Sequence, residues 1–282
     1  MRANADELFG GEVITSRQNP TVKRVCALLE KKARRREGLF RFDGIKLLCE
    51  AAEKRLELEL VLISEALEPS VRLRLSELAA AGGIDAGRIL CVSSSVFEKV
   101  SEEASPEGII TVAKVPAKIH SRIERVEDYS AEGRLLIVEA MRDPGNLGTV
   151  IRSASALGID RLIISDDCAE LYNPRTVRAA MGALFTLRID IADTEDMPLL
   201  IKRLRSQGRE IYATALTDDA RRINEIELRE GDAFVIGNEG HGLSEAVIKA
   251  SSGAVIIPMT EGSESLNAAA AAAICIWETV RA

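Results

Sequence analysis

The fold of this chain is decided by the stretch Leu135–Arg152, which reads LLIVEAMRDPGNLGTVIR. Its first four residues are apolar on both faces of an extended chain, which is typical of a strand buried inside a parallel sheet. A turn at Pro144-Gly145 then leads into a helix that starts near Asn146. A buried strand followed by a tight turn and a helix predicts an α/β domain.

The same alternation of strands and helices continues to the C-terminus. The predicted strands are short apolar runs bounded by turn residues, at 135–139, 162–165, 185–189, 211–215, 233–237 and 255–258. Helices fill most of the gaps between them. We therefore assign residues 134–282 to one α/β domain.

The front part, residues 1–116, shows a second α/β rhythm, for which we expect helices packed on a mostly parallel sheet. Its predicted strands are 39–42, 58–63, 89–92 and 108–115, and its predicted helices are 20–36, 44–54, 70–81 and 94–101. The stretch 117–133 is polar, so we predict that it is a linker between the two domains.

Composition limits the kind of protein. The 282 residues are 46% hydrophobic, which is enough for a core in each of two domains. The five cysteines and two histidines lack metal-ligand spacing, so we expect no metal site. No stretch reaches the roughly 20 apolar residues that span a bilayer, and the N-terminus lacks an apolar signal segment. These features favour a reduced cytoplasmic protein.

Charge is distributed unevenly. The formal net charge of −7 argues at first against nucleic acid, but residues 17–46 hold ten basic side chains against three acidic ones. Apolar residues at helical spacing separate them, which predicts an amphipathic helix with a cationic outer face. This face is either simply solvated or binds RNA phosphates. The basic residues are Arg17, Lys23, Arg24, Lys31, Lys32, Arg34, Arg35, Arg36, Arg41 and Lys46.

Two further segments join a strand to a polar loop. Phe234–Leu243 (FVIGNEGHGL) ends in glycines spaced G-x-x-G-x-G, whose backbone can approach a ligand closely. This spacing is neither a dinucleotide fingerprint nor a phosphate-binding G-x-x-x-x-G-K-[ST], which disfavours a nucleotide-dependent oxidoreductase. Ile256–Asn267 (IIPMTEGSESLN) precedes six alanines that predict a close-packed helix.

The polar residues of these segments also have plainer interpretations. Asn146, Ser265 and Asn267 are natural helix caps, and Arg152 is a candidate for a surface ion pair. Glu239 is harder to explain in this way. A carboxyl group in a tight glycine loop loses hydration unless a partner satisfies it.

Taken together, the segments resemble the three motifs of the SpoU branch of the SPOUT methyltransferases. These motifs are N-x-G-x-x-x-R at Asn146–Arg152, I-G-x-E-x-x-G-[LM] at Ile236–Leu243, and I-P-M followed by S-L-N, at Ile257–Met259 and Ser265–Asn267. Many relatives have Val-Ser where this chain has Ala268-Ala269, and many have Glu in place of Asp43. The front domain resembles the small substrate-binding domain often fused to these enzymes, at Ile14–Pro20, Asp43-Gly44 and Ser105–Ile109.

The resemblance implies a knotted α/β catalytic domain that transfers a methyl group from S-adenosyl-L-methionine to a ribose 2′-hydroxyl of RNA. It favours ribosomal RNA over transfer RNA, and it implies a homodimer. The alternative is a non-catalytic RNA-binding protein derived from the same family. We expect Arg152 to clamp the target phosphate and ribose rather than act as a base, because a guanidinium stays protonated in proteins.

The resemblance also implies which residues form the sites. The catalytic residues would be Arg152, Asn146, Glu239, Ser265 and Asn267. The cofactor-binding residues would be Ala215, Gly237, Asn238, Gly242, Ile257, Met259 and Leu266. The RNA-binding residues would be Arg17, Lys23, Arg24, Lys31, Lys32, Arg34, Arg35, Arg36 and Arg41.

Overall fold

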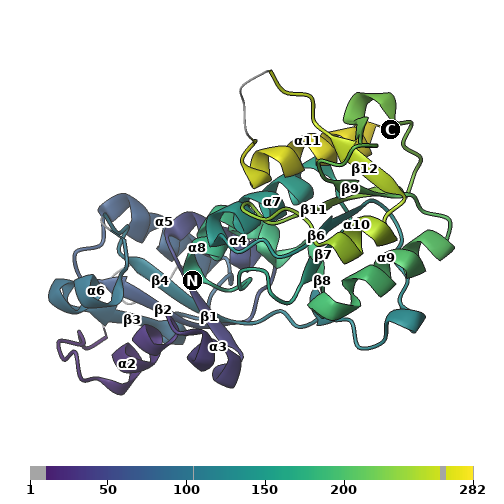
Figure 1. Ribbon diagram of the computed structural model, residues 1–282. Coiled ribbons are helices and arrows are strands. Elements are labelled where there is room, and N and C mark those ends of the chain that lie inside the picture. Colours follow the sequence, from purple (N-terminus) through teal and green to yellow (C-terminus); the bar gives the residue numbers. More distant parts are fainter. Residues whose placement is uncertain (1–10, 104, 261–264, 282) are drawn as a thin grey trace. The chain divides into compact units, whose positions relative to one another are not determined.

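The computed structural model describes residues 11–103, 105–260 and 265–281. The chain divides into two compact units, shown with their elements in Figure 1. The first unit consists of Met1–Pro116 and Tyr172–Arg178, and the second of Ala117–Leu171 and Ala179–Ala282. Both units combine helices with a β-sheet, which confirms the predicted α/β class.

The first unit contains a four-stranded sheet in the order β1-β4-β2-β3. β4 is antiparallel to both β1 and β2, and only β2 and β3 form a parallel pair, so the prediction of a mostly parallel sheet is wrong for this unit. The strands are β1 (Leu39–Asp43), β4 (Ile109–Lys114), β2 (Leu58–Ser64) and β3 (Ile89–Val92).

The direction of β4 explains this error. The chain leaves β3 and enters β4 at the same end of the sheet, where the Ser64 N–H donates to the Gly108 carbonyl (2.9 Å). It first runs along α6 (Ser94–Val100) and then approaches β4 through residues 105–108. Although β3, α6 and β4 follow one another as strand, helix and strand, β4 therefore runs antiparallel to its neighbours β1 and β2.

The predicted helix 20–36 is also wrong, because the chain forms two helices, α2 (Pro20–Ala27) and α3 (Lys31–Glu37). Arg34 reaches back to the end of α2, where its Nη1 donates to the carbonyls of Leu28 (2.8 Å) and Leu29 (2.6 Å). These carbonyls lie at a helix end, where the backbone lacks intrahelical partners. Arg34 is therefore buried, not part of a cationic outer face.

The remaining helices of the first unit complete its core. α2 and α6 bring Val22, Val25 and Phe97 into one apolar cluster with the sheet. The other helices are α4 (Ile45–Glu53), α5 (Pro69–Ala80) and the 3₁₀ helix η1 (Ala86–Arg88).

The second unit is built on an eight-stranded sheet in the order β10-β12-β9-β11-β6-β7-β8-β5, and every strand pair in it is parallel. β6 and β11 are buried along their whole length, as their apolar sequences predict. The last strand, β12, lies between β9 and β10 and not beside β11. The strands are β5 (His120–Arg122), β6 (Leu135–Val138), β7 (Arg161–Ser165), β8 (Arg188–Ala192), β9 (Ile211–Thr214), β10 (Arg221–Arg222), β11 (Ala233–Ile236) and β12 (Gly253–Ile256).

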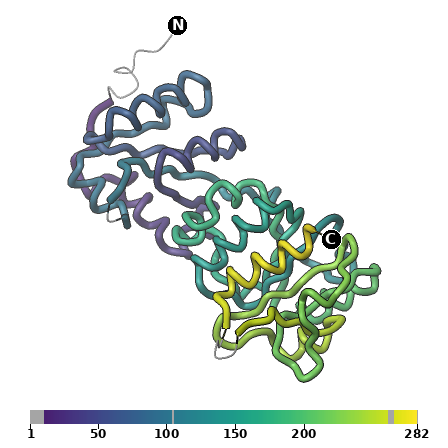
Figure 2. The backbone as a smooth tube through the Cα atoms, turned by 90° about the horizontal axis from the view of Figure 1, so that it is seen from above, coloured from purple at the N-terminus to yellow at the C-terminus, as the bar shows by residue number. Residues whose placement is uncertain are grey.

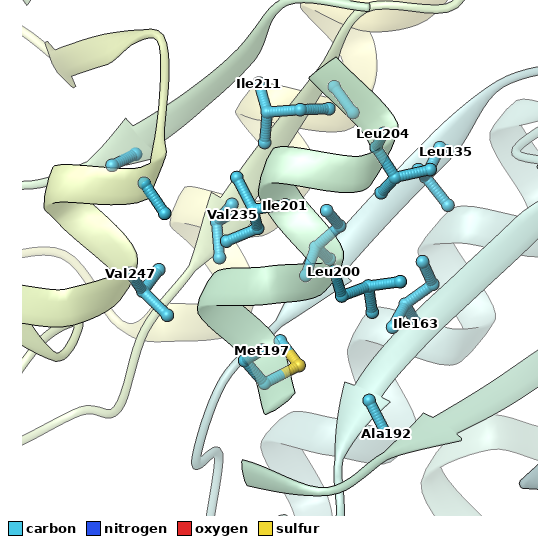
Figure 3. Packing of buried hydrophobic residues seen from close by; sticks show 14 of the residues in the cluster. Leu135, Ile163, Ala192, Met197, Leu200, Ile201, Leu204, Ile211, Val235 and Val247 are labelled. Carbon is cyan, nitrogen blue, oxygen red and sulfur yellow. The ribbon is translucent and has the colours of Figure 1, made fainter. Parts of the chain in front are cut away.

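Helices cover both faces of this sheet. On one face, Leu200, Ile201 and Val247 from α9 and α10 pack against the strands (Figure 3). On the other face, α7 and α11 lie side by side although they are far apart in the sequence (Figures 1 and 2). The α-helices of this unit are α7 (Pro144–Leu157), α9 (Met197–Ser206), α10 (Glu245–Ala250) and α11 (Ala268–Arg281), whereas α8 (Pro174–Ala180) lies mostly in the segment 172–178, which belongs to the first unit. The 3₁₀ helices are η2 (Val126–Asp128), η3 (Met181–Phe185), η4 (Thr194–Asp196) and η5 (Ile223–Glu225).

Residues 117–133, which the sequence predicts to be a linker, contribute β5 and η2 to the second unit. Their polar side chains bind a buried carboxyl group: Asp190 accepts hydrogen bonds from Ser121 (2.7 Å) and Tyr129 (2.6 Å) and pairs with Arg161. Burial opposes ionisation of Asp190, but the bonds from Tyr129, Ser121 and Arg161 outweigh it and lower its pKa. Two polar residues of this stretch, Ser121 and Tyr129, therefore serve an internal cluster, while most of its other polar residues are exposed.

β8 also lies further along the chain than predicted. The sequence predicts a strand at 185–189, whereas the structure has η3 up to Phe185 and β8 at Arg188–Ala192. Leu184, Phe185 and Leu187 are all buried. An apolar run without a period does not reveal where a buried turn ends and a buried strand begins.

His120 gives the second unit a predictable pH dependence. It is buried at the start of β5, and this burial lowers its pKa from 6.5 to about 4. Because its pKa in the folded protein is below that in the unfolded chain, protonation favours unfolding as the pH falls from about 6.5 towards 4. We expect the free energy of unfolding to fall by roughly 3 kcal/mol more between pH 7 and pH 4 in the wild type than in His120→Gln. Urea titrations of both proteins at pH 7 and at pH 4 measure this difference. An equal decrease of the unfolding free energy in the two proteins would contradict it.

Candidate active site

The candidate site lies where the carboxyl ends of β9, β11 and β12 meet. The loops that follow these strands line a cavity of about 480 Å³, which is within the size range of small-molecule sites. In open parallel sheets, ligands bind outside the carboxyl ends of the strands. All of the residues that the sequence assigns to the cofactor line this cavity, namely Ala215, Gly237, Asn238, Gly242, Ile257, Met259 and Leu266.

The glycine loop after β11 is folded back on itself. The Asn238 and Gly242 backbones exchange two hydrogen bonds, each 3.0 Å long. A Cβ atom on Gly237 would lie 2.4 Å from the carbonyl carbon of Gly242 and 2.6 Å from the Leu243 nitrogen. Glycine is therefore required at position 237, because only a hydrogen atom fits between the two sides of the loop.

Three of the predicted catalytic residues form a chain of hydrogen bonds. Asn267 Nδ2 donates to Asn146 Oδ1 (3.0 Å), and Asn146 Nδ2 donates to Glu239 Oε1 (2.8 Å). Glu239 also lines the cavity, so the chain ends in its wall. Residues from the first, second and third sequence segments thus meet in one place.

Helix α11 fixes which groups donate and which accept in this hydrogen-bond chain. Asn267 Oδ1 accepts hydrogen bonds from the N–H groups of Ala269 (2.9 Å) and Ala270 (3.2 Å), so the amide nitrogen must face Asn146. Asn146 then has to accept from Asn267 and donate to Glu239. The result is that Glu239 Oε1 acts as an acceptor.

Asn146 is not the N-cap of its helix. Asp143 caps α7, accepting from the Asn146 N–H (2.8 Å), and Pro144 occupies the first turn. The side chain of Asn146 is thereby released for the contact with Glu239. Asn267 does cap α11, as its plainer interpretation suggests, and uses its amide nitrogen for the chain at the same time.

The two other predicted catalytic residues lie differently. Ser265 lines the cavity. Arg152 is exposed on α7, is not part of the cavity wall, and forms no hydrogen bond or ion pair with any residue that the structure describes. Within a single chain, Arg152 is therefore a free guanidinium outside the cavity.

Sequence reasoning missed Glu139, the residue that follows β6. It is 3% exposed, and its two carboxyl oxygens accept from the N–H (2.8 Å) and the hydroxyl (2.7 Å) of Ser244. A signal was present, because a carboxyl group ends a fully apolar strand and burial of such a group requires partners.

The predicted RNA-binding residues fall into three sets within the first unit. Arg34 and Arg41 are buried, and Arg41 donates to the Val100 carbonyl (2.8 Å) and pairs with Asp43 (3.1 Å). Arg24 forms ion pairs with Glu37 (2.7 Å) and Glu59 (3.4 Å). The other six side chains are exposed as well, and among them Arg36 pairs with Glu37 (2.9 Å). We call these six residues the cationic surface: Arg17, Lys23, Lys31, Lys32, Arg35 and Arg36.

Within the described ranges, no helix has both the length and the hydrophobicity that a membrane crossing demands. Among the same residues, no group of His, Cys, Asp and Glu is arranged to hold a metal ion.

Comparison with known proteins identifies both units. Residues 133–277 match the SpoU rRNA Methylase family, and residues 19–111 match the MRM3-like substrate binding domain. The chain is 30% identical to the 23S rRNA (guanosine(2553)-2′-O)-methyltransferase RlmP of Bacillus subtilis, an alignment that covers 94% of this chain and 97% of that protein.

Two crystal structures extend the comparison. The AdoMet-bound rRNA methyltransferase from Sinorhizobium meliloti has a TM-score of 0.77 at 28% identity, over 96% of this chain and 97% of that one. The SpoU methyltransferase AviRb from Streptomyces viridochromogenes, in complex with AdoMet, has a TM-score of 0.75 at 26% identity, over 94% and 98%.

Fold, cavity and comparisons define a methyltransferase with a parallel α/β sheet and a separate substrate-binding domain. The chain belongs to the SpoU rRNA methylase family. It is an RNA ribose 2′-O-methyltransferase that uses S-adenosylmethionine as the methyl donor.

Proposed function

We propose that the cavity binds S-adenosylmethionine and that the methyl acceptor is a 2′-hydroxyl of ribosomal RNA. The observation that carries this proposal is the position of Glu239, which belongs both to the cavity wall and to the hydrogen-bond chain from Asn146 and Asn267. A methyl donor bound in the cavity and a methyl acceptor bound beside the hydrogen-bond chain would therefore meet at Glu239.

The residues of the cavity fit such a donor. Leu243, Ile248 and Val255 offer apolar contacts, while the glycine loop presents backbone groups to polar atoms. Glu239 adds a carboxyl group, which suits a positively charged molecule. The cavity thus offers each kind of contact that S-adenosylmethionine requires.

The mechanism follows from these positions. Bound in the cavity, S-adenosylmethionine supplies an electrophilic methyl group, and the protein has to hold the acceptor hydroxyl in line with it. Asn146 and Asn267 fix Glu239 through Oε1, while Oε2 forms no hydrogen bond with a described residue. We assign to Oε2 the task of accepting the hydroxyl proton. Arg152 would hold the target phosphate and stabilise the developing negative charge on the ribose oxygen.

We also propose a homodimer with α7 and α11 at its interface. Trp277 on α11 is 55% exposed, and a large aromatic side chain in water favours burial in a protein interface. A dimer would also explain Arg152, which lies outside the cavity of its own chain and would serve the partner's cavity. Sedimentation velocity of the full chain tests this, with a species of twice the mass expected.

Two finer features of the family belong to the same proposal. The placement of β12 between β9 and β10, away from the preceding strand β11, supports a knotted topology. A cytoplasmic location is consistent with ribosomal RNA as the substrate, and the five free cysteines support a reducing compartment.

We propose that the cationic surface binds the RNA backbone. Lys31 and Arg35 lie one turn apart on α3, and both are exposed. Replacing both with alanine should weaken RNA binding about tenfold at moderate salt and reduce the log–log salt slope by about 2, because each lost phosphate contact removes about one unit. Fluorescence anisotropy at several salt concentrations measures both values.

The matched control removes two exposed lysines from the second unit, Lys202 and Lys249. This double alanine variant has the same change in net charge, so RNA affinity should stay near that of the wild type. Equal losses in both variants would mean that overall charge matters and not the cationic surface.

Mapping ribose methylation in RNA from cells with and without the protein tests the substrate. The loss of one ribosomal 2′-O-methyl group is expected, whereas the loss of a transfer RNA methyl group would overturn that choice. Calorimetry with S-adenosylmethionine separates the enzyme from a non-catalytic RNA-binding protein, because a pure binding module would give no heat.

A further inference from the structure

The two residues that follow β6, Glu139 and Ala140, contact the glycine loop from outside the cavity. Neither of them lines the cavity. We propose that Glu139, acting through Ser244, is a positioning residue that holds the glycine loop in the shape that binds the methyl donor. This inference rests on the proposed assignment of the cavity to S-adenosylmethionine.

Glu139 fixes the far end of the loop. Ser244 follows the glycine loop directly and is the N-cap of α10, where its hydroxyl accepts from the Val247 N–H (3.3 Å). Both oxygens of Glu139 accept from this one residue, so the carboxyl group fixes the start of α10 as well as the end of the loop. In addition, the Glu139 N–H donates to the Ile236 carbonyl (2.8 Å) at the end of β11, just before the loop begins.

Ala140 fixes the near end. Its carbonyl accepts from Asn238 Nδ2 (2.7 Å), and Asn238 Oδ1 accepts from the N–H groups of Gly240 (2.8 Å) and His241 (3.1 Å). The amide group of Asn238 is therefore engaged inside the protein, so we assign its side chain to the shape of the loop and only its backbone to the cavity.

The conformation of Ala140 is held by a further contact. Its φ of +55° is unusual for alanine, and its N–H donates to the Ser165 hydroxyl (2.8 Å) at the end of β7. Such a conformation persists only where the surroundings determine it. Here it turns the carbonyl towards Asn238.

These contacts matter because the loop has little rigidity of its own. Gly237, Gly240 and Gly242 leave the backbone free to adopt many conformations, and ordering it on binding would weaken affinity for the donor. Anchors at both ends order the loop before the donor arrives. Their loss should therefore reduce donor affinity, while turnover at saturating donor should change little.

The experiment compares Glu139→Gln with Asp190→Asn, using the full chain. Both variants replace a buried carboxyl group that accepts from a serine hydroxyl, but Glu139 follows the central strand β6, whereas Asp190 on β8 binds Ser121 of the edge strand β5. We expect Glu139→Gln to raise Kd and KM for S-adenosylmethionine at least about tenfold, which corresponds to a loss of roughly 1.4 kcal/mol in binding free energy. Its kcat should stay within about threefold of the wild-type value. Asp190→Asn should lower the melting temperature but leave Kd within about threefold.

A second pair of variants keeps the proposal testable if Glu139→Gln fails to fold. Ser244→Ala removes the hydroxyl and should raise Kd for S-adenosylmethionine by a similar factor, while Ser244→Thr keeps it and should restore Kd to within about threefold. Folded Glu139→Gln or Ser244→Ala with wild-type Kd would overturn the inference, as would an equal rise in Asp190→Asn.

Failure of the inference can be distinguished from failure of the proposed site. Ala271→Trp places a large ring in the cavity wall. Wild-type donor affinity in that variant would mean that S-adenosylmethionine binds elsewhere, and the proposed function would fail with the inference. Lost affinity in Ala271→Trp beside unchanged affinity in Glu139→Gln would remove only the role of Glu139.

Discussion

Replacing Arg152 with alanine is expected to lower kcat at saturating RNA by about 10²–10³-fold, which is the usual cost of removing a group that stabilises charge in the transition state. Arg152 is exposed, and no described residue neutralises its guanidinium. It is therefore available to a phosphate without breaking an internal contact. Since we assign Arg152 to the target phosphate of the RNA and not to the methyl donor, the affinity for S-adenosylmethionine should stay unchanged.

Single-turnover methylation of RNA, together with calorimetry of donor binding, measures the two effects separately. Arg152→Lys should recover part of the rate, because it keeps the charge but loses the planar fork of donors. Arg188→Ala is the matched control, since Arg188 is also exposed but begins β8, at the amino end of the sheet. Near-normal turnover of Arg152→Ala would remove this residue from the mechanism.

The three segments of the candidate site stand out in the sequence because their residues lie in local patterns, and the roles of these residues are implied by the resemblance to the SpoU motifs. Each of the three segments ends a buried strand and continues into a loop with glycine, proline or capping residues, and such turn chemistry is visible in a few adjacent positions. The segments place Asn146, Glu239 and Asn267 at the carboxyl ends of strands or at helix starts. The structure then joins these three side chains by hydrogen bonds.

The errors arise where a residue's partner is distant or on another element. Arg34 and Arg41 look like surface residues, because periodicity cannot show that backbone carbonyls of neighbouring elements accept from them. The buried contact of Glu139 with Ser244 joins residues that are far apart in the chain. For the same reason the sequence does not predict the order of strands in the sheet, in which β12 pairs with β9 and not with the preceding strand β11.

The largest effect on donor binding is expected from Gly237→Ala. The added Cβ atom would meet the Gly242 carbonyl carbon at 2.4 Å and the Gly242 oxygen at 2.7 Å. Both are backbone atoms, so no side-chain rotation can relieve the contact, and the two sides of the loop must separate. A displacement of about 1 Å at a binding loop can reduce function about 10²-fold. We therefore expect affinity for S-adenosylmethionine to fall by about that factor or more.

Gly240→Ala separates this steric effect from a general loss of loop flexibility. Gly240 belongs to the same loop, but a Cβ atom there would lie 3.5 Å from Asn238 Oδ1, an ordinary contact. Both variants reduce the freedom of the unfolded chain to a similar extent. The unfolding free energy should fall by about 3 kcal/mol in Gly237→Ala, as in an overpacked core, and by less than about 1 kcal/mol in Gly240→Ala. If both variants bind the donor equally well, the close approach of Gly237 to Gly242 does not shape the cavity, and the loop's contribution to donor binding has to be sought in its side chains.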